Sequence, residues 1–460
     1  MMTRKLPIIA LATAPGKAGV GVIRISGANL LSMAQALFQK SLKPREASLL
    51  TLRSGDGAPI DQLIAIYFSA PASFTGEDVL ELQCHGGPQL LELVMKRCLE
   101  LGKDQGLVIA EPGEFSLRAY LNNKIDLAQA EAIADLIDAQ SEAAVRGAAR
   151  SLQGTFSNDI NGLIEEITQL RILVESTLDF PEEEIEFLEN AQARERLNTV
   201  MQKLHLLREG AKQGKILRDG IQLVLAGAPN VGKSSLLNRL AGEEVAIVTP
   251  IAGTTRDRVK ESITINGVPM HLIDTAGLRE TTDLVEAKGI ERSWESIRAA
   301  DLLIFLQDPN AKGDADTLAA LELKDQILKA LPAKCPVLEV NNKSDLLGKA
   351  PSIQGEVQPL FISAKTGDGI EALKHKILES VGWGGSQEGA IVARRRHLDC
   401  LDRAAAHLEK SQQFAADGNI SLELFAEELR LAQDQLGHIT GKLLPDDLLG
   451  KIFSQFCIGK

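Results

Sequence analysis

The spacing of hydrophobic residues changes three times along this chain of 460 residues. Up to about residue 124, short apolar runs typical of strands alternate with two stretches of helical spacing, Asn29–Lys40 and Pro88–Leu101. This alternation predicts an α+β domain over residues 1–124.

Helical spacing predominates after residue 124. Asp126 and Gln129 have the spacing of a helix capping box, and glycine and proline are rare from there to Leu152. Apolar residues then recur every three or four positions in four stripes, which predicts amphipathic helices that pack against other helices. The stripes are Ile160, Leu163, Ile167, Leu170 and Val174; Leu197, Val200, Leu204, Leu207 and Ala211; Leu398, Leu401, Ala405 and Leu408; and Leu422, Phe425, Leu429, Ala432 and Leu436.

These stripes form two helical blocks, residues 125–217 and 384–460, on either side of a segment with α/β spacing, 218–383. The economical interpretation is one helical domain with that segment inserted at a surface loop, since insertion succeeds where chain ends lie close together. Two independent helical domains are the alternative, but neither block alone has many helices to bury its stripes against. We therefore predict a multidomain α/β fold: an N-terminal α+β domain, a central all-helical domain and an inserted α/β domain.

Composition and charge set the cellular context. The chain is 44% hydrophobic and 24% charged, as expected of a soluble globular protein of about three domains. Its five cysteines include no C-x-x-C pair, which argues against a disulfide framework or a zinc site. No segment has the length of a membrane span or the features of a signal peptide, so we expect a cytoplasmic protein without membrane insertion.

The net charge of −12 argues against a general nucleic-acid binder held by a basic surface. Residues 1–124 carry 13 Lys and Arg against 11 Asp and Glu, a balance of +2, which leaves 37 against 51, or −14, for the rest. The N-terminal part is therefore the less repulsive region for RNA or another anion, although a balanced surface is also ordinary for any domain.

A phosphate-binding loop lies near the middle of the chain. Residues 227–234 read G-A-P-N-V-G-K-S, between an apolar strand at 221–226 and a helix that starts at Ser234. The glycines let backbone amides approach a polyphosphate, Lys233 supplies charge to the β and γ phosphates, and the Ser234 hydroxyl is a Mg²⁺ ligand. The inserted segment therefore binds a nucleotide.

Three further motifs at strand ends indicate which nucleotide is bound. Asn266 and Gly267 form a hairpin turn between two strands, and the second strand ends in Asp274-Thr275-Ala276-Gly277, which can sense Mg²⁺ and the γ phosphate. In Asn342-Lys343-Ser344-Asp345, the carboxylate can accept both N–H groups of guanine, whereas adenine would leave it unpaired. Ser363-Ala364-Lys365 can offer an amide to guanine O6. In this order the motifs predict a P-loop GTPase domain of the Ras-like α/β type.

The residue that positions the attacking water differs from that of many small GTPases. They carry glutamine after the glycine that corresponds to Gly277, whereas this chain has Leu278. Another residue, from the segments 249–257 or 278–292, must take that role.

Taken together, the GTPase motifs, GTTRD at 253–257, DTAGLRE at 274–280, APGKAGVGVIRISG near the N-terminus, NNKIDLAQAEAIADLIDAQ at 122–140 and the terminal FCIGK resemble the MnmE (TrmE) family of tRNA-modifying GTPases. The resemblance covers essentially the whole chain. It implies the following nucleotide contacts: Asn230, Val231, Gly232, Lys233, Ser234, Ser235, Thr249, Pro250, Ile251, Ala252, Gly253, Thr254, Thr255, Asp274, Thr275, Ala276, Gly277, Asn342, Lys343, Ser344, Asp345, Ser363, Ala364 and Lys365.

The resemblance also implies hydrolysis stimulated by K⁺ and by dimerisation of the nucleotide domains. A K⁺ ion can supply the positive charge that an arginine finger brings elsewhere. Glu286 matches the family's catalytic acid, although a glutamate in a charged helix is usually only solvated. Asn230 could equally be a residue that shapes the loop. The implied ligands are Asn230, Thr249, Ile251 and Thr254 for K⁺, and Ser234 and Thr255 for Mg²⁺.

By the same resemblance, the N-terminal domain forms the homodimer and binds a one-carbon donor of the 5-formyl- or methylene-tetrahydrofolate type. The implied folate contacts are Arg24, Glu81, Lys124 and Lys460, each of which could instead be an ordinary surface or salt-bridged residue. A FAD-dependent partner of the MnmG (GidA) type would complete a heterotetramer. The product would be an aminomethyl or carboxymethylaminomethyl group at C5 of the wobble uridine of certain tRNAs.

A regulatory GTPase switch in ribosome or ribonucleoprotein assembly, without covalent chemistry, is the alternative function. The folate-like motifs and the FCIGK tail favour the modifying enzyme. Cys457 and His85 have both chemical and structural interpretations, with packing of the tail and stabilisation of a turn the simpler ones.

Overall fold

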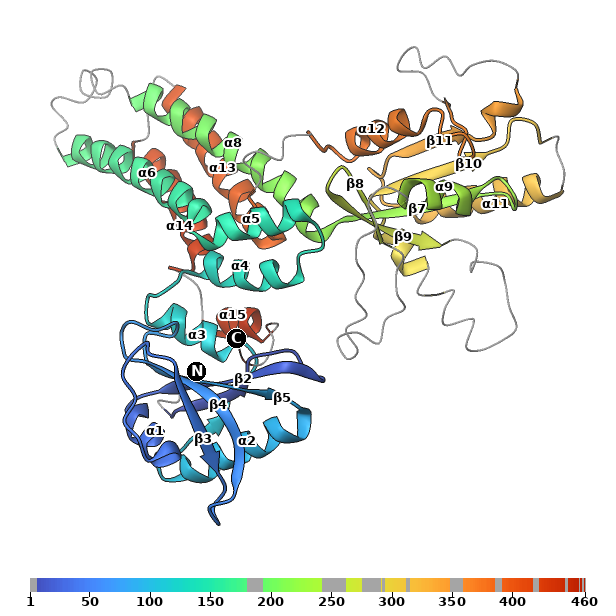
Figure 1. Ribbon diagram of the computed structural model, residues 1–460. Coiled ribbons are helices and arrows are strands. Elements are labelled where there is room, and N and C mark those ends of the chain that lie inside the picture. The colour runs from blue at the N-terminus through green and yellow to red at the C-terminus, as the bar shows by residue number, and fades with distance from the viewer. Residues whose placement is uncertain are drawn as a thin grey trace. The chain divides into compact units, whose positions relative to one another are not determined.

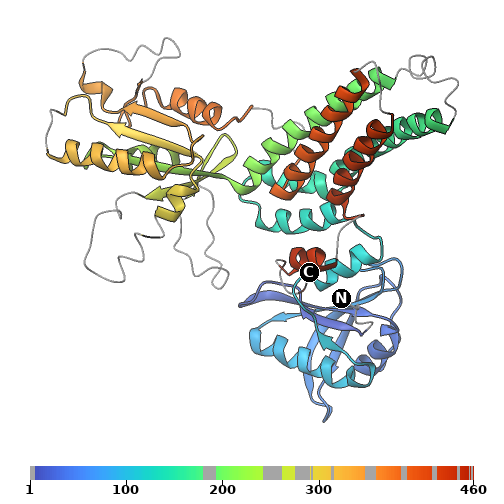
Figure 2. The same cartoon turned by 180° about the vertical axis from the view of Figure 1, so that it is seen from behind.

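The fold was analysed in a computed structural model of the chain (Figures 1 and 2). The structure describes residues 6–179, 193–241, 262–274, 291, 294–311, 315–347, 359–384, 391–416, 422–442, 446–454, 456 and 459. The chain forms two compact units. Unit 1 comprises residues 1–134, 152–194 and 406–460, and unit 2 comprises residues 135–151 and 195–405.

The N-terminal part of unit 1 is a six-stranded sheet with two helices packed on one face and a third, short helix on the other (Figure 1). Helices α1 (Leu30–Phe38) and α2 (Pro88–Leu101) share a core with the strands, in which Ile23, Ile25 and Leu80 are fully buried. The strand order is β3-β4-β5-β2-β1-β6, with β1 Ile8–Leu11, β2 Ala18–Gly27, β3 Ser48–Arg53, β4 Pro59–Phe68, β5 Asp78–Gly86 and β6 Val108–Ile109. All neighbouring strands are antiparallel except β1 and β6. The predicted α+β fold is confirmed.

The short helix η1 (Lys103–Gln105) lies between α2 and β6, and the sheet is followed by α3 (Glu114–Leu121) and α4 (Leu127–Asp138). The capping box at the start of α4 is formed in both directions. The Gln129 amide N–H donates to Asp126 Oδ1 over 2.9 Å, and the Asp126 amide N–H donates to Gln129 Oε1 over 3.0 Å. The local sequence therefore sets the start of this helix, as predicted.

Long helices make up the rest of unit 1. Helix α6 (Thr155–Asp179) packs along α14 (Leu422–Thr440), and the predicted stripe of each is buried. Helix α13 (Arg395–Ala416) continues into this unit, and α15 (Asp446–Phe453) lies near the C-terminus. One stripe shifts by a residue, because Ala404 is fully buried in α13 and Ala405 is only partly buried.

Unit 2 contains a second six-stranded sheet with helices on both faces, which confirms the predicted Ras-like α/β fold (Figures 1 and 2). Its order is β12-β11-β10-β7-β9-β8, with β7 Ile221–Gly227, β8 Ser262–Ile265, β9 Val268–Asp274, β10 Leu302–Gln307, β11 Val337–Asn341 and β12 Leu360–Phe361. Only the β8–β9 hairpin is antiparallel. Its turn residues Asn266 and Gly267 have φ values of 49° and 81°, as a two-residue hairpin requires.

The two faces of this sheet have separate cores. Helices α9 (Lys233–Ala241) and α12 (Ile370–Ser380) pack on one face against Leu223 and Leu225, whereas α11 (Ala315–Ala330) packs on the other against Val224. This alternation is expected of a central parallel strand that is buried on both faces. Unit 2 also includes α5 (Glu142–Leu152), nearly all of α8 (Ala193–Asp219) and the short helix η4 (Ser344–Leu346).

Candidate functional site

The phosphate-binding loop has the backbone that its sequence predicts. Gly227, Asn230 and Gly232 all have positive φ, of 154°, 60° and 97°. A Cβ atom on Gly227 would lie 2.3 Å from the carbonyl oxygen of Leu306, so only glycine fits between β7 and β10. The Lys233 ammonium group folds over the loop and donates to the carbonyl oxygens of Gly227 and Ala228, over 2.8 and 2.9 Å. The lysine is thus held where a polyphosphate would lie.

Asn342 connects three of the sequence motifs. Its Nδ2 donates to the Val231 carbonyl oxygen in the phosphate-binding loop over 2.7 Å, and its Oδ1 accepts from the Ala364 amide over 2.9 Å. The side chain is buried, and it packs so closely that a Cβ atom on Gly232 would lie 2.3 Å from Nδ2. The structure therefore brings residues 230–235, 342–345 and 363–365 together around one asparagine.

The carboxylate expected to read guanine is held in place. Ser363, fully buried, donates its hydroxyl to Asp345 Oδ1 over 2.8 Å. This hydrogen bond fixes the orientation of the carboxylate, which can still accept further hydrogen bonds. Recognition of the two N–H groups of guanine requires such an oriented acceptor.

Two residues near this site, Asp308 and Arg239, were not predicted from the sequence. Lys343 has a left-handed backbone with φ of 62°, and its Nζ donates to Asp308 Oδ2 over 2.8 Å. Burial raises the pKa of Asp308, but the hydrogen bond and charge of Lys343, together with hydrogen bonds from Asn310, outweigh it and lower that pKa below its usual range. Arg239, on α9, donates to the Lys365 carbonyl oxygen over 3.1 Å. Asp308 directly follows β10, and this position at the end of a parallel strand is the signal that could have identified it.

Of the other residues expected to contact the nucleotide, the structure describes only some. Asp274 ends β9 and pairs with Leu225 of β7, so it lies at the same edge of the sheet as the phosphate-binding loop. Thr249–Thr255, Thr275–Gly277 and Glu286 lie outside the described residues. Asn230 and Ser234 are described, and the left-handed backbone of Asn230 suits asparagine on its own account.

A second group of candidate residues lies on the N-terminal sheet. Arg24 and Glu81 are cross-strand neighbours on β2 and β5, and they lie on the face opposite α1 and α2 because Ile23, Ile25 and Leu80 point toward those two helices. Arg24 Nε and Nη2 donate to Glu81 Oε1 over 2.9 and 2.8 Å. Both contacts use one oxygen, so Glu81 Oε2 can accept hydrogen bonds from a ligand.

Two aromatic rings lie against the guanidinium group of Arg24. The centre of its guanidinium group lies 5.6 Å from the Phe74 ring and 5.9 Å from the Phe115 ring. Both distances lie within the range of a cation–π contact. The Arg24 and Glu81 side chains keep 22% and 18% of their surface exposed, so the pair is held but accessible.

Lys124 joins this region through the loop that carries Phe74. Its ammonium group donates to the Pro71 carbonyl oxygen over 3.1 Å. Gly76, with φ of 77°, packs against its stem, where an added Cβ would lie 3.2 Å from Lys124 Cγ. The structure thus places Arg24 and Lys124 in contact with the same loop, residues 70–77.

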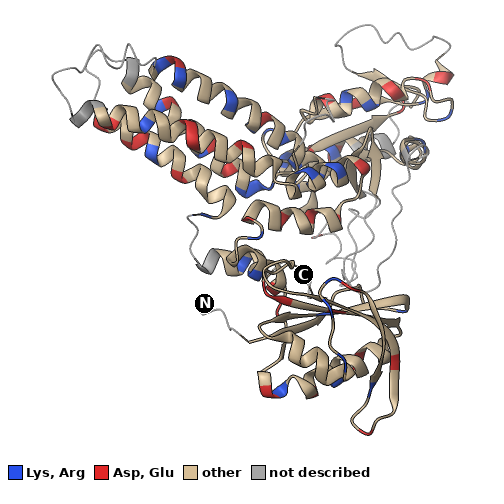
Figure 3. Ribbon diagram, turned by 60° about the vertical axis from the view of Figure 1, so that its left-hand side comes forward, with Lys and Arg blue, Asp and Glu red and all other residues tan. Residues whose placement is uncertain are grey.

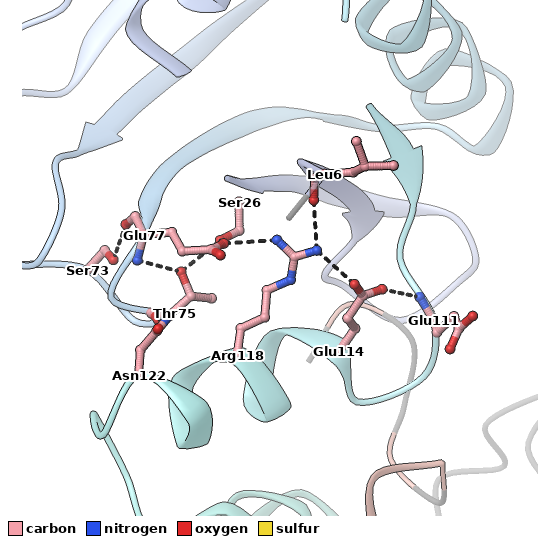
Figure 4. A network of polar contacts seen from close by, with 9 residues as sticks. All are labelled: Leu6, Ser26, Ser73, Thr75, Glu77, Glu111, Glu114, Arg118 and Asn122. Carbon is pink, nitrogen blue, oxygen red and sulfur yellow. Dashed lines mark hydrogen bonds and ion pairs between the residues drawn. The ribbon is translucent and has the colours of Figure 1, made fainter. Parts of the chain in front are cut away.

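A buried arginine holds that loop on the sheet (Figure 4). Arg118 of α3 donates to Glu77 over 3.0 Å, to Glu114 over 2.8 Å and to the Leu6 carbonyl oxygen over 2.8 Å, and its side chain is only 7% exposed. Further bonds in this network are Ser26 to Glu77, Ser26 to Thr75, Thr75 to the Glu77 amide, Ser73 to the Glu77 carbonyl, Asn122 to the Thr75 carbonyl and Glu114 to the Glu111 amide. The loop is therefore fixed by side chains rather than by regular secondary structure.

The C-terminal tail reaches the same sheet. A Cβ atom on Gly459, which has φ of 94°, would lie 2.3 Å from the Leu11 carbonyl oxygen, and Ala10, next to Leu11 on β1, pairs with Arg24. Phe453 and Phe456 are buried upstream of it. Lys460 and Cys457 lie outside the described residues, and His85 is bonded through Nδ1 to Asp61 over 2.7 Å.

The described part of the chain contains neither a cluster of metal-binding residues nor a helix that could span a membrane. No group of three His, Cys, Asp or Glu residues is arranged to hold a metal ion there, and none of the described helices is both long and apolar enough to cross a membrane. Lys and Arg are interspersed with Asp and Glu along the described helices (Figure 3). Charge therefore does not single out an RNA surface.

Comparison with known proteins covers the whole chain. Residues 7–124 match the family model for the GTP-binding protein TrmE N-terminus, and residues 127–457 match that for the MnmE helical domain. The tRNA modification GTPase MnmE of Polynucleobacter asymbioticus is 79% identical, and that of Bordetella parapertussis 56% identical, each over 100% of both chains. Among solved structures, Era in complex with MgGDPNP and a segment of 16S ribosomal RNA matches 41% of this chain and 66% of its own, at 28% identity and a TM-score of 0.27. On the two family models and the full-length relatives, the chain belongs to the MnmE family of GTPases.

Proposed function

We propose that this GTPase modifies C5 of the wobble uridine in certain tRNAs, together with a FAD-dependent partner and with a folate as one-carbon donor. The names of the full-length relatives support tRNA as the substrate. The proposed organisation is an N-terminal domain at 1–124, a helical domain made of 125–217 and 384–460, and the GTPase domain at 218–383. The arrangement of Arg24, Glu81 and Lys124 around the loop at 70–77 is the observation that carries the modifying function, because a GTPase switch alone would not need it.

The GTP site accounts for binding and for the choice of guanine. Lys233 would neutralise the β and γ phosphates, Asp345 would accept the guanine N–H groups, and Asn342 would keep the two regions in register. Ser234 and Thr255 would hold Mg²⁺. Asn230, Thr249, Ile251 and Thr254 would hold K⁺, which supplies positive charge to the phosphates when bound. Glu286 would orient or deprotonate the attacking water.

The N-terminal site has the chemistry that a reduced folate needs. Glu81 can accept hydrogen bonds from the donors of a pterin ring, while Arg24 keeps the carboxylate oriented. Lys124 and Lys460 would bind the carboxylates of the glutamate tail. The close contact of Gly459 with Leu11 supports a role for the C-terminal tail beside this sheet.

The proposed assembly is a homodimer joined by the N-terminal domains and completed by a flavoprotein of the MnmG type. This part rests on family membership. It divides the chemistry in a physically sensible way, since the flavoprotein would supply the redox cofactor and this chain the folate, the GTP cycle and the positioning.

Nucleoside analysis of tRNA tests the proposal. In cells that lack this protein, the C5 substituent should disappear from wobble uridines, and the wild-type gene should restore it. Lys233→Ala and Glu81→Ala should fail to restore it, whereas Glu92→Ala, an exposed glutamate on α2 of the same domain, should succeed. Intact wobble uridines in the deletion strain would instead support the assembly-switch function.

Folate binding is tested separately by calorimetry with 5-formyl-tetrahydrofolate and the full chain. Removal of a charged acceptor from a buried ligand contact should weaken binding by about tenfold or more in Glu81→Ala. Equal affinities of wild type, Glu81→Ala and Glu92→Ala would remove Glu81 from the site.

A further inference from the structure

Asp135 links the two ends of the GTPase domain. It lies in the last turn of α4, and its carboxylate, 5% exposed, accepts from Arg218 Nε over 2.7 Å and from Arg394 Nη2 over 2.8 Å. Arg218 lies in the last turn of α8, directly before β7, and Arg394 directly precedes α13. One carboxylate therefore binds both the connection that enters the GTPase domain and the connection that leaves it. We call Asp135, Arg218 and Arg394 the Asp135 clamp.

Other contacts hold these two connections together beside the clamp. The Gln213 side chain of α8 donates to the Gly382 carbonyl oxygen over 2.7 Å and accepts from the Gly384 amide over 3.0 Å. Gly214, the next residue of α8, lies so close to the outgoing backbone that a Cβ atom on it would be 1.7 Å from the Ile391 carbonyl oxygen. The connections are therefore not two independent flexible linkers but one packed junction.

The junction also contacts the strand that runs to the nucleotide side of the sheet. Asp219, next to Arg218 in sequence, offers its carbonyl oxygen to His271 Nε2 over 3.2 Å. His271 lies on β9, the strand that ends at Asp274, and that residue is the expected sensor of Mg²⁺ and the γ phosphate. A displacement of β9 on nucleotide binding would thus act directly on the end of α8 that Asp135 binds.

Helix α4 extends this link beyond the junction. Its first half contributes Leu127 and Ala130 to a buried cluster with Phe453 and Phe456 of the C-terminal region. Its last turn contributes Asp135 to the clamp. Because a helix is stiff over three turns, a change at one end is passed to the other. We propose that Asp135 is a positioning residue that couples the nucleotide state of the GTPase domain to α4 and, through α4, to the C-terminal tail.

Electrostatics make the clamp sensitive to a single substitution. Arg218 and Arg394 share one oxygen of Asp135, and Arg218 also pairs with Asp219, so neutral asparagine at position 135 would remove the negative charge that bridges the two guanidinium groups. Asp135 should then no longer hold α4 to both connections, which Gln213 still joins to each other, while the phosphate-binding loop, the guanine site and the sheet keep their own contacts. The coupling should be lost without loss of the nucleotide site.

Hydrogen exchange of the full-length protein tests this inference without tRNA, folate or the flavoprotein, so it is independent of the proposed modification reaction. With saturating Mg²⁺ and a non-hydrolysable GTP analogue, amides of residues 127–138 in the wild type should change their exchange rates by about fivefold or more. In Asp135→Asn this response should fall to within about twofold of no change, with GTP turnover kept within about threefold of wild type.

Asp138→Asn is the matched control, because Asp138 lies on the same helix three residues later and is exposed. It should respond as the wild type does. Arg218→Gln breaks the incoming half of the clamp, through which β9 reaches α4, and leaves Asp135 paired with Arg394. It should lose the response as well, even if Asp135→Asn proves unstable. Asp135→Glu, which keeps the charge, should retain most of it. The inference is overturned if α4 does not respond in the wild type, or if Asp135→Asn or Arg218→Gln responds as fully as Asp138→Asn.

Discussion

Asn342 donates a hydrogen bond to the Val231 carbonyl oxygen 111 residues earlier in the chain, at a distance of 2.7 Å. The same side chain accepts from the Ala364 amide. The guanine-reading loops and the phosphate-binding loop are therefore joined by an amide group that has both a donor and an acceptor in use. This arrangement explains why asparagine, with its two-sided amide, stands at this position rather than aspartate or serine.

Asn342→Ala should weaken nucleotide binding. The substitution leaves the Val231 carbonyl and the Ala364 amide without their partner in a buried site, at a cost of about 1–3 kcal/mol, or about a 5- to 150-fold loss of GDP affinity. Calorimetric titration of the full chain with GDP measures it. Asn238→Ala, an exposed asparagine on α9 in the same domain, should bind GDP normally. Normal binding by Asn342→Ala would show that the loops stay in register without this amide.

Asp345→Asn should change the base preference from guanine to xanthine. A carboxylate accepts from the two N–H groups of guanine, whereas an amide can accept one N–H group and donate to the O2 carbonyl of xanthine. The mismatched pairs leave buried polar groups unpaired, so we expect about a hundredfold or greater reversal of the GTP to XTP turnover ratio. Ser363→Ala, which removes the hydrogen bond to Asp345, should lower GTP affinity without gaining XTP. Equal loss of both nucleotides in Asp345→Asn would contradict direct recognition of the base.

Arg118→Ala should destabilise the N-terminal domain strongly. It would leave the carboxylates of Glu77 and Glu114 without the cation that they share, and the loss of one partner from a buried ion pair typically costs about 3–5 kcal/mol. Denaturant unfolding measures the free energy. Arg97→Ala, on α2 of the same domain, removes an ion pair with a half-exposed glutamate and a hydrogen bond to the Arg53 carbonyl oxygen, and should cost less, about 1–2 kcal/mol. Similar costs for the two variants would mean that the network in Figure 4 adds little stability.

The local features of this fold could be predicted from sequence because they depend on neighbouring residues. The bounds of α2, the capping box at Asp126 and Gln129, and the Asn266-Gly267 turn all follow from chemistry within four positions. The buried alanine of α13 could not be predicted in this way, since both Ala404 and Ala405 suit a helical stripe. The packing partner decides which of the two is buried.

Buried charges were the harder part of the prediction. Nothing in the sequence marks Asp135, Arg118 and Asp308 as buried charges, because each has a partner at a distant position. The partner of Asp135 at Arg394 is 259 residues away. Only the tertiary structure shows that these groups are paired, and pairing is what allows a charge to be buried.

Glu286→Ala should slow hydrolysis while GTP still binds. If this carboxylate orients or activates the attacking water, its loss removes transition-state stabilisation worth about 10²- to 10³-fold in turnover and leaves the ground-state contacts unchanged. Single-turnover hydrolysis in K⁺, with GTP affinity measured on the same sample, separates the two effects. Glu291→Ala, an exposed glutamate five residues later, is the control. Equal rates for Glu286→Ala and wild type would return Glu286 to an ordinary solvated role.

Asn230→Gly should decide between the two roles of Asn230. Its φ of 60° is left-handed, a conformation that glycine adopts without strain, so the substitution removes the side-chain oxygen and preserves the loop. If the oxygen binds K⁺, turnover of Asn230→Gly should become equal in K⁺ and Na⁺ at matched ionic strength, whereas the wild type should be about tenfold or more faster in K⁺. Asn266→Gly changes the other left-handed asparagine of this domain, at φ of 49° in the β8–β9 turn, and should keep the wild-type K⁺ response. If Asn230 only shapes the loop, Asn230→Gly will keep the K⁺ stimulation, and the ion must be held by other ligands.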